Sequence, residues 1–273
     1  MIAPVVEDDS ASFEKPAEVY DRFVGRYGHP LAVALLERIT VRPGWRLLDV
    51  GCGPGQLTAV LADTVGSSNV AAIDPSEPFV LACRNRVSGA DVRVAPAEQL
   101  PFADDSFDAT LSQLVVNFLT DPAAGVQEMR RVTRSGGLVA ASVWDYAGEM
   151  TMLRAFWDAA TGVDPNRAPA LDEGRRMRYC QPEELAELWT DAGLEDVATD
   201  AIAVDAAYED FEDLWSPFTT GVGPAGAYCT SLSETEQTAL KVAYHDRLGA
   251  PRGAFELTAR AWFVRGRVPA DSG

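Results

Sequence analysis

The stretch Arg46-Leu-Leu-Asp-Val-Gly-Cys-Gly-Pro-Gly-Gln-Leu-Thr58 decides the fold of this chain. Residues 46–50 form a short apolar run typical of a buried strand, and residues 57–65 have the spacing of a helix. The glycines between them permit a sharp turn and the close approach of a ligand where a Cβ would clash. Free N–H groups at the start of the following helix suit a polar or anionic ligand group. We expect a strand–loop–helix unit that binds a ligand; a tight turn without a ligand is the alternative.

Outward from this loop, apolar runs alternate with helical segments. Further strands are expected at 69–74, 92–95, 107–112 and 138–143, and helices at 76–87, 122–132 and 182–193. Strand-like segments at 195–205 and 254–265 complete a set of seven. Strands separated by single helices pair in parallel, so the pattern predicts an α/β fold with a doubly wound sheet.

The remaining segments predict how the chain is organised. Two short helices are expected on either side of Gly28-His29-Pro30, and an aromatic-rich helical insert precedes the last strand. The predicted parts are a disordered tail at 1–12, a helical segment at 13–40, a core at 41–145 completed by 146–206 and 250–268, and an insert at 207–249.

Composition narrows the class of partner. The chain has 273 residues with 23 Lys and Arg against 41 Asp and Glu, a net charge of −18. Such a surface repels phosphate backbones, which argues against a nucleic-acid partner. The four cysteines are scattered without a CxxC spacing, so neither paired disulfides nor a metal site is expected. No secretory signal or membrane-spanning stretch is visible, so we expect a cytoplasmic protein that does not enter a membrane.

Asp74 stands at the expected end of the second strand, 19 residues beyond Gly55. A carboxylate at this place can accept both hydroxyls of a ribose. Its alternative role is to cap the next helix, for which Ser76 is also a candidate. The third glycine comes one residue too early for a G-x-G-x-x-G dinucleotide motif, because Gln56 occupies that position.

Four segments together resemble the ordered motifs of one family. They are Leu47 to Thr58, Asp74-Pro-Ser76, Ala97-Glu-Gln-Leu-Pro-Phe102 and Phe107-Asp108. The chain resembles the class I S-adenosylmethionine-dependent methyltransferases, and most closely the branch with the ubiquinone/menaquinone and natural-product enzymes. The resemblance implies a Rossmann-like, mainly parallel seven-stranded sheet with an N-terminal helical lid and a helical insert before the last strand.

The resemblance implies a role for each residue at the methionine end of the cofactor. Gly51, Cys52 and Gly53 would line the methionine moiety through their backbone. Asp49 would support the ammonium group, directly or through water, and Gln113 would place its backbone carbonyl near it.

At the adenosine end the resemblance implies that Asp74 binds the ribose hydroxyls and that Pro75 packs on the adenine. Ala97 would offer its N–H to a ring nitrogen, with Glu98 beside it. Relatives often carry an aspartate before this pair, and here Pro96 takes that position. Recognition of adenine would then depend on Ala97 or on another acceptor.

Segment 20–27 looks like the lid of this branch, with Tyr20 and Arg26 as cofactor contacts, and Leu114 would border the cofactor. An ordinary amphipathic helix with a surface arginine is the alternative for this segment. Of the two histidines, His29 is favoured over His245 as an acid or base, because its segment should cover the reaction centre.

The acceptor pocket is expected to be apolar, because the donor sulfur loses its charge during transfer. Its candidate lining residues come from the insert and from loops above the sheet, although ordinary helix packing also explains the aromatic ones. They are Asn117, Phe118, Trp144, Trp215, Phe218 and Tyr228.

The expected function is transfer of a methyl group from S-adenosyl-L-methionine to an O, N or C atom of a small molecule by in-line displacement, giving S-adenosyl-L-homocysteine. The protein would act as a monomer or homodimer. A non-catalytic S-adenosylmethionine-binding protein and, less favoured, an NAD-type oxidoreductase are the alternatives.

Overall fold

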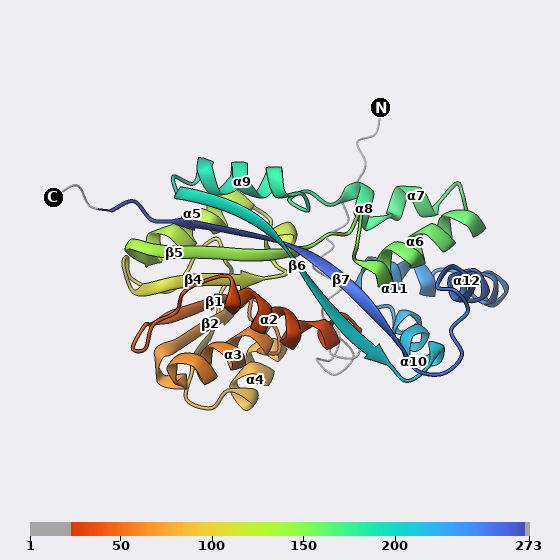
Figure 1. Cartoon of the computed structure of the whole chain (residues 1–273), viewed down its shortest axis with the longest axis horizontal. Helices are drawn as coiled ribbons and strands as arrows, with labels where there is room; N and C mark the ends of the chain where they lie inside the picture. The colour runs from red at the N-terminus through yellow and green to blue at the C-terminus, as the bar shows by residue number, and fades with distance from the viewer. Residues whose placement is uncertain (1–22, 271–273) are drawn as a thin grey trace. The chain divides into compact units, whose positions relative to one another are not determined.

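The structure is a computed structural model that describes residues 23–270, so Tyr20 and the tail at 1–12 lie outside the described residues. The chain divides into two compact units. Unit 1 contains Tyr146–Met177 and Asp205–Thr258 together with residues 23–26. Unit 2 contains Tyr27–Asp145, Arg178–Val204 and residues 259–270, and it holds the glycine loop and the sheet apart from strand residues 205–208 and 255–258 (Figure 1).

The sheet has seven strands in the order β3-β2-β1-β4-β5-β7-β6. The strands are β1 (Leu47–Val50), β2 (Val70–Asp74), β3 (Asp91–Val94), β4 (Phe107–Gln113), β5 (Thr133–Trp144), β6 (Glu195–Tyr208) and β7 (Phe255–Arg267). Strands β1 to β5 pair in parallel, and β7 runs antiparallel to β5. The expected Rossmann-like, mainly parallel seven-stranded fold is therefore confirmed. The reversal of strand order between β1 and β4 opens a crevice at their carboxyl ends, where ligands bind in such sheets.

Helices cover both faces of the sheet in unit 2. On one face lie α2 (Gly28–Glu37), α3 (Gln56–Val65) and α4 (Glu77–Arg86), and on the other lie α5 (Pro122–Val132) and α9 (Pro182–Asp191), as Figure 1 shows. Helix α5 begins where sequence signals place it, because Asp121 accepts a hydrogen bond from the N–H of Ala124 and Pro122 occupies the first turn. The helices leave β1, β2 and β4 buried along nearly their whole length.

Unit 1 is helical and has an aromatic core. Its elements are α6 (Thr151–Val163), α7 (Ala168–Leu171), α8 (Glu173–Arg176), α10 (Phe211–Trp215), η5 (Ser216–Thr220), α11 (Gly223–Thr230) and α12 (Glu234–Arg247). Phe156 of α6 stacks on Phe218 at 4.4 Å between ring centroids, and Tyr244 of α12 meets both rings edge-on. Asp172, fully buried, pairs with Arg154 at 2.7 Å. Breaking that pair would leave a buried charge without a partner, so it constrains how α6 and α8 pack.

Three expectations about local structure were wrong. Gly28-His29-Pro30 does not separate two α-helices; it forms the first turn of α2, after a 3₁₀ turn at Val24–Tyr27. Proline is tolerated there because first-turn N–H groups have no helical partner. Strand β5 begins at Thr133 rather than 138, because the glycine pair lies inside the strand. Ser76 is the residue before α4, but its side chain makes no capping hydrogen bond.

We expected the helical insert at residues 207–249, and the helical unit of the structure is larger than this. Residues 146–177, assigned in the sequence analysis to completion of the core, belong with unit 1. Helix α6 explains the difference, because its buried residues Leu153, Phe156 and Trp157 recur at helical spacing and enter the aromatic core.

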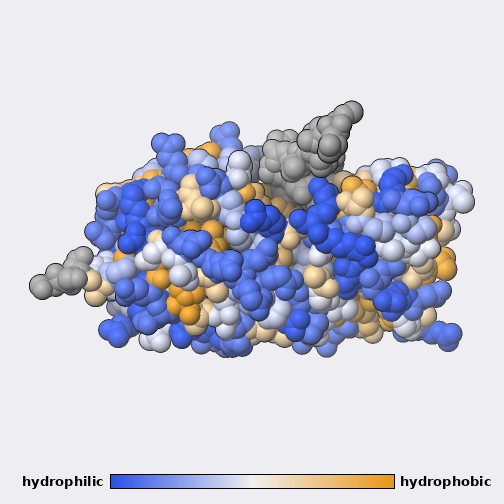
Figure 2. Space-filling view, turned by 90° about the horizontal axis from the view of Figure 1, so that it is seen from above, coloured by the Kyte–Doolittle hydropathy of each residue, from blue (hydrophilic) through white to orange (hydrophobic). Residues whose placement is uncertain are grey.

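The surface is largely hydrophilic on the face shown in Figure 2, where hydrophobic residues gather only in small patches. Within residues 23–270 no helix combines the length and the apolar character needed to cross a bilayer.

Candidate functional site

The glycine loop joins β1 to α3 by a backbone path that requires glycine. Gly51, Gly53 and Gly55 have φ angles of 76°, 50° and 92°. The N–H groups of Gly51 and Cys52 both donate to the carbonyl oxygen of Ile73, at 2.8 and 2.9 Å, which fixes the loop to the end of β2. The sequence therefore sets the shape of the loop through three left-handed positions that other residues rarely adopt.

Two glycines of the loop differ in what surrounds them. A Cβ on Gly51 would stand 2.4 Å from one methyl carbon of Val115, in the segment after β4. A Cβ on Gly53 would meet no atom within 4 Å. Gly51 is thus needed for packing, whereas Gly53 borders open space into which a ligand can come against the backbone.

Asp49 lies in β1 directly before the loop and is 1% exposed. Its Oδ2 accepts a hydrogen bond of 2.6 Å from the hydroxyl of Thr58, and its Oδ1 has no hydrogen-bond partner. Burial raises the pKa of Asp49 from 3.8 to about 7, against the lowering effect of the Thr58 hydrogen bond; the negative charge of nearby Asp74 adds to the rise. A cationic donor at Oδ1 would offset the cost of burying this charge.

Gln113 ends β4 and presents a second buried acceptor. Its Nε2 donates to the carbonyl oxygen of Gly28 in α2 at 3.0 Å, so Oε1 is the free end of the amide, and it has no partner. In the register of the sheet Asp49 pairs with Leu111, two residues before Gln113, so both acceptors lie on the same face. The next residue, Leu114, has a φ of +64° and donates its N–H to the backbone carbonyl oxygen of Ser142. The resemblance implies a role for the backbone carbonyl of Gln113, and its side-chain oxygen is a further acceptor at the same place.

An unpaired carboxylate oxygen and an unpaired amide oxygen on one face suit an ammonium group, which has three N–H donors and no acceptor. Both atoms stand at the carboxyl ends of neighbouring parallel strands, β1 and β4. Within residues 23–270 no group of three or more His, Cys, Asp or Glu could hold a metal ion.

Asp74, at the end of β2, holds the loop in place. Its Oδ2 accepts from the N–H of Gly53 at 2.9 Å and its Oδ1 from the N–H of Ser76 at 2.8 Å. Burial raises its pKa, and these two hydrogen bonds oppose the rise. Each carboxylate oxygen has two lone pairs, so both can still accept a hydroxyl. Asp74 therefore accepts a hydrogen bond at the start of α4, which was the alternative role expected for it. It also remains able to bind the hydroxyls of a ribose.

The residues expected at adenine lie beyond β2 and β3. Pro75 is exposed, which leaves its ring free to pack on a flat ligand, and Ala97 is 4% exposed. Glu98 accepts from the N–H groups of Thr120 and Asp121, at 3.1 and 3.2 Å. The Glu98 carboxylate thus fixes the segment before α5. A contact between Glu98 and adenine would have to use the same carboxylate that makes these two hydrogen bonds.

Of the expected lid contacts, only Arg26 lies within the described residues. Its guanidinium binds both carboxylate oxygens of Asp213, at 3.0 and 3.1 Å, and lies 4.2 Å above the ring of Tyr208. The Arg26 guanidinium is therefore engaged by two residues of its own unit, unit 1. His29 is exposed on α2, and its role as an acid or base stays a prediction.

The structure divides the acceptor candidates between the two units. Asn117 and Phe118 form the 3₁₀ turn η4 (Val116–Phe118), and Trp144 ends β5; all three belong to unit 2. Trp144 is buried, packs edge-on against Tyr27 at 5.8 Å, and its Nε1 has no hydrogen-bond partner.

Trp215, Phe218 and Tyr228 belong to unit 1. Trp215 and Phe218 are 4% and 0% exposed and pack into the aromatic core, as the alternative of ordinary helix packing expected. Tyr228 is buried with an unpartnered hydroxyl, and burial raises its pKa.

Three residues that adjoin the candidate site could not be singled out from the sequence. Thr58 binds Asp49, Gly28 orients Gln113, and Ser142 has a buried hydroxyl without a partner. Ser142 pairs with Gln113 in the sheet, so its side chain and that of Trp144, two residues on, share the face of the two acceptors. Thr58 offered a signal, since a hydroxyl on the buried side of a helix after the loop needs a partner. The place of Ser142 depends on strand register, and that of Gly28 depends on how α2 packs against the end of β4.

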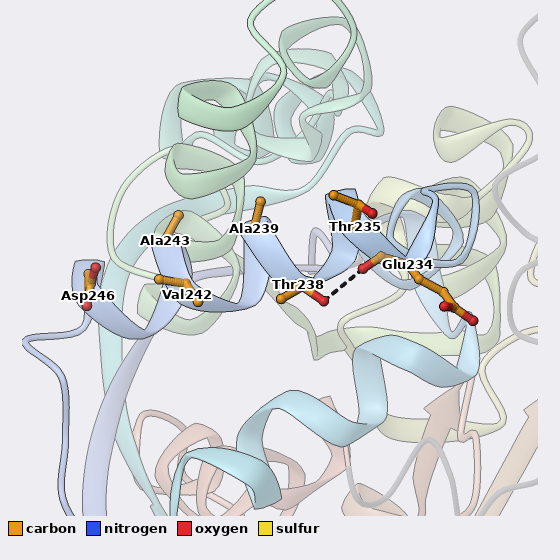
Figure 3. Close-up of a pocket in the computed structure, with 7 residues that line it drawn as sticks. All are labelled: Glu234, Thr235, Thr238, Ala239, Val242, Ala243 and Asp246. Carbon is orange, nitrogen blue, oxygen red and sulfur yellow. Dashed lines mark hydrogen bonds between the residues drawn. The ribbon is translucent and has the colours of Figure 1, made fainter.

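A surface hollow of about 740 Å³ lies on α12, outside the residues considered so far. Figure 3 shows the seven side chains that line it along one side of this single helix, with the Thr238 hydroxyl donating to the Glu234 carbonyl at 2.8 Å. No residue expected at the site lines it.

Comparisons with known proteins agree with this geometry. A family model described as "Methyltransferase domain" matches residues 48–141, which run from β1 into β5. A demethylmenaquinone methyltransferase of Roseiflexus castenholzii is 31% identical over 177 residues, which are 59% of this chain and 73% of the relative. A malonyl-[acyl-carrier protein] O-methyltransferase of Salmonella typhimurium is 34% identical over 161 residues, which are 59% of this chain and 61% of that relative.

Among solved structures, phosphoethanolamine N-methyltransferase 2 of Haemonchus contortus with bound S-adenosyl-L-methionine matches 98% of this chain and 61% of its own. Its TM-score is 0.60 at 15% identity, which shows a shared fold. The motif match, the extent of the Roseiflexus match and the fold agree: the chain belongs to the class I S-adenosylmethionine-dependent methyltransferases.

Proposed function

We propose that this enzyme transfers the methyl group of S-adenosylmethionine to an O, N or C atom of a small-molecule acceptor. The observation that supports the placement of the cofactor is the pair of unsatisfied buried acceptors, Asp49 Oδ1 and Gln113 Oε1. They fit the ammonium group of the methionine moiety, and the open space at Gly53 leaves room for its chain against the backbone. Asp74 binds the ribose hydroxyls in this proposal, and Pro75 packs on the adenine.

The cofactor, when bound, supplies a methyl group attached to a positively charged sulfur. The chain contributes binding and orientation, which can lower the barrier of such a displacement by up to about 7–11 kcal/mol. Asp49 binds the ammonium group of the cofactor. The hydrogen bond from the Thr58 hydroxyl to Asp49 Oδ2 keeps the carboxylate oriented towards that group. Gly28 does the same for the amide of Gln113.

The acceptor side of the proposal rests on the apolar end of β5 and the segment after β4. Trp144 is buried there with a free indole N–H, which can donate to an oxygen of the acceptor. The net charge of −18 disfavours a polyanionic acceptor such as RNA. The relative named after demethylmenaquinone supports a metabolic acceptor of low mass.

A labelling experiment tests this proposal. Purified protein is incubated with S-adenosylmethionine labelled in the methyl group and with a bacterial extract separated into small-molecule, protein and RNA fractions. We expect label to enter the small-molecule fraction, and Asp49→Asn to reduce its rate by roughly 30-fold or more, as expected for a lost buried charge pair. The label should survive treatment with protease and nuclease.

Two outcomes would overturn the proposal. Label confined to RNA or protein would refute a small-molecule acceptor. Binding of S-adenosylhomocysteine without transfer to any fraction would favour the non-catalytic alternative.

A further inference from the structure

Two cysteines of unit 2 meet beneath the glycine loop. Cys52 lies in the loop between Gly51 and Gly53, and Cys83 lies in α4. They are 6% and 0% exposed and share one hydrophobic cluster with Ala72, Val80 and Val92. The sequence separation of the pair hid this contact, which arises because α4 returns along β2.

The Cys83 sulfur touches the loop and the hydroxyl that holds Asp49. A Cβ on Gly55 would stand 2.9 Å from the Cys83 sulfur. The Cys83 Sγ donates to the hydroxyl of Thr58 at 3.5 Å, and that hydroxyl donates to Asp49 at 2.6 Å. A change at Cys83 is therefore transmitted to the carboxylate by two hydrogen bonds.

The Cys52 thiol donates to the carbonyl oxygen of Gly53 at 3.6 Å. Its interaction with the Cys83 thiol raises the pKa of Cys52, with burial adding to the rise, and lowers the pKa of Cys83. One thiol that ionises more readily beside one that keeps its proton is the arrangement from which disulfides form. Cys229 differs from Cys83 in this respect, because burial alone raises the pKa of the Cys229 thiol to about 11.

We propose that Cys52 and Cys83 are a site of reversible oxidation, and that their disulfide and the bound cofactor exclude each other. This inference rests on the placement of S-adenosylmethionine at the glycine loop proposed above. The oxidant is a hydroperoxide. One thiol is oxidised to a sulfenic acid while the O–O bond is reduced and an alcohol or water leaves. The second thiol attacks that sulfur, the S–S bond forms, and water leaves.

The exclusion follows from geometry. An S–S bond of about 2.05 Å is far shorter than a hydrogen bond between thiols, so it draws Cys52 towards α4. The next residue, Gly53, donates its N–H to Asp74, and this contact moves with it. Oxidation also removes the proton that Cys83 donates to Thr58. Because the coupling is reciprocal, a ligand that holds the loop in its present form must oppose formation of the disulfide to the same extent.

The test begins with reduced protein and S-adenosylhomocysteine in calorimetric titration. The protein is then treated with hydrogen peroxide, with and without saturating S-adenosylhomocysteine, and digested for mass spectrometry. We expect a cross-linked peptide pair containing Cys52 and Cys83, formed at least tenfold more slowly in the presence of the ligand. We expect the oxidised protein to bind the ligand at least tenfold more weakly, and dithiothreitol to restore the affinity.

Variants separate the pair from general oxidative damage. Cys83→Ala should form no cross-link, and whatever affinity it has for the ligand should be the same before and after peroxide. Cys229→Ala, a matched loss of a buried thiol in unit 1, should respond to peroxide as the natural protein does. A disulfide that leaves the affinity unchanged would overturn the inference, and so would a protein that binds the ligand when reduced but never forms the cross-link. Failure of the reduced protein to bind would refute the proposed cofactor placement instead.

Discussion

Replacing Asp49 by asparagine should remove tight binding of S-adenosylmethionine and, at the same time, stabilise the protein without ligand. The variant loses the charge that faces the ammonium group, a change that costs about 2–4 kcal/mol for a buried charge pair, or roughly 30- to 1000-fold in Kd. Stability rises because the natural carboxylate is buried with an unpaired oxygen and its pKa is raised to about 7.

The sign of the pH dependence follows from that pKa. Between about pH 4 and 7 the folded protein holds the Asp49 proton more tightly than the unfolded chain, so the free energy of unfolding falls as the pH rises through this window. The asparagine variant lacks this contribution and should gain about 1–3 kcal/mol at pH 7.5. Affinity of the natural protein for the cofactor should fall about tenfold per pH unit below 7, since the bound form needs the carboxylate.

Calorimetric titration and thermal unfolding measure the two effects. Asp63→Asn, an exposed carboxylate of α3 removed in the same way, is the control and should change neither. Natural affinity in the Asp49→Asn protein would contradict the placement of the ammonium group.

Alanine at Gly53 and alanine at Gly51 should fail in different ways. Both positions have a positive φ, which costs an alanine about 1–2 kcal/mol. At Gly53 the added methyl points into open space, so the protein should fold but bind the cofactor at least tenfold more weakly, because the methyl occupies the ligand's path.

At Gly51 the methyl meets three atoms of Val115, at 2.4, 2.7 and 3.1 Å, so rotation of that side chain does not relieve the clash. We expect Gly51→Ala to lose about 2–5 kcal/mol of stability, which lowers the unfolding midpoint by about 2–4 °C per kcal/mol. The pair is compared by thermal unfolding without ligand and by titration with S-adenosylhomocysteine. Equal affinity of Gly53→Ala and the natural protein would show that the ligand does not pass the loop at this point.

The parallel core of the fold could be predicted because its signals are local. Helix α5 begins at a proline that follows a capping aspartate, and β1 is an apolar run that ends in glycine. Helix α6 was missed although its apolar residues have helical spacing, because Met150 stands at the cap position before it and gives no signal that a helix begins. The packing of α6 against α12 depends on contacts between residues far apart in the sequence, such as Phe156 and Tyr244, which no local sequence pattern predicts.

The candidate site was predictable to the extent that single motifs specify it. Asp49, Gly53 and Asp74 follow from the loop and its spacing, whereas the side-chain role of Gln113 requires knowing that the carbonyl of Gly28 comes to its amide. Arg26 shows the opposite case. Its charge suggested a ligand contact, but Asp213, distant in the sequence, binds it through both oxygens.

The central claim is that the cationic end of S-adenosylmethionine lies against Asp49 at the glycine loop. Its most direct test is the number of protons released when S-adenosylhomocysteine binds, obtained from titrations at pH 7 in buffers of different ionisation enthalpy. A carboxyl group with a pKa of about 7 is half protonated there, and it releases that proton to the buffer when an ammonium group binds beside it. We predict release of about half a proton per ligand in the natural protein and none in Asp49→Asn. Equal release in both proteins, or none in the natural one, would contradict the claim.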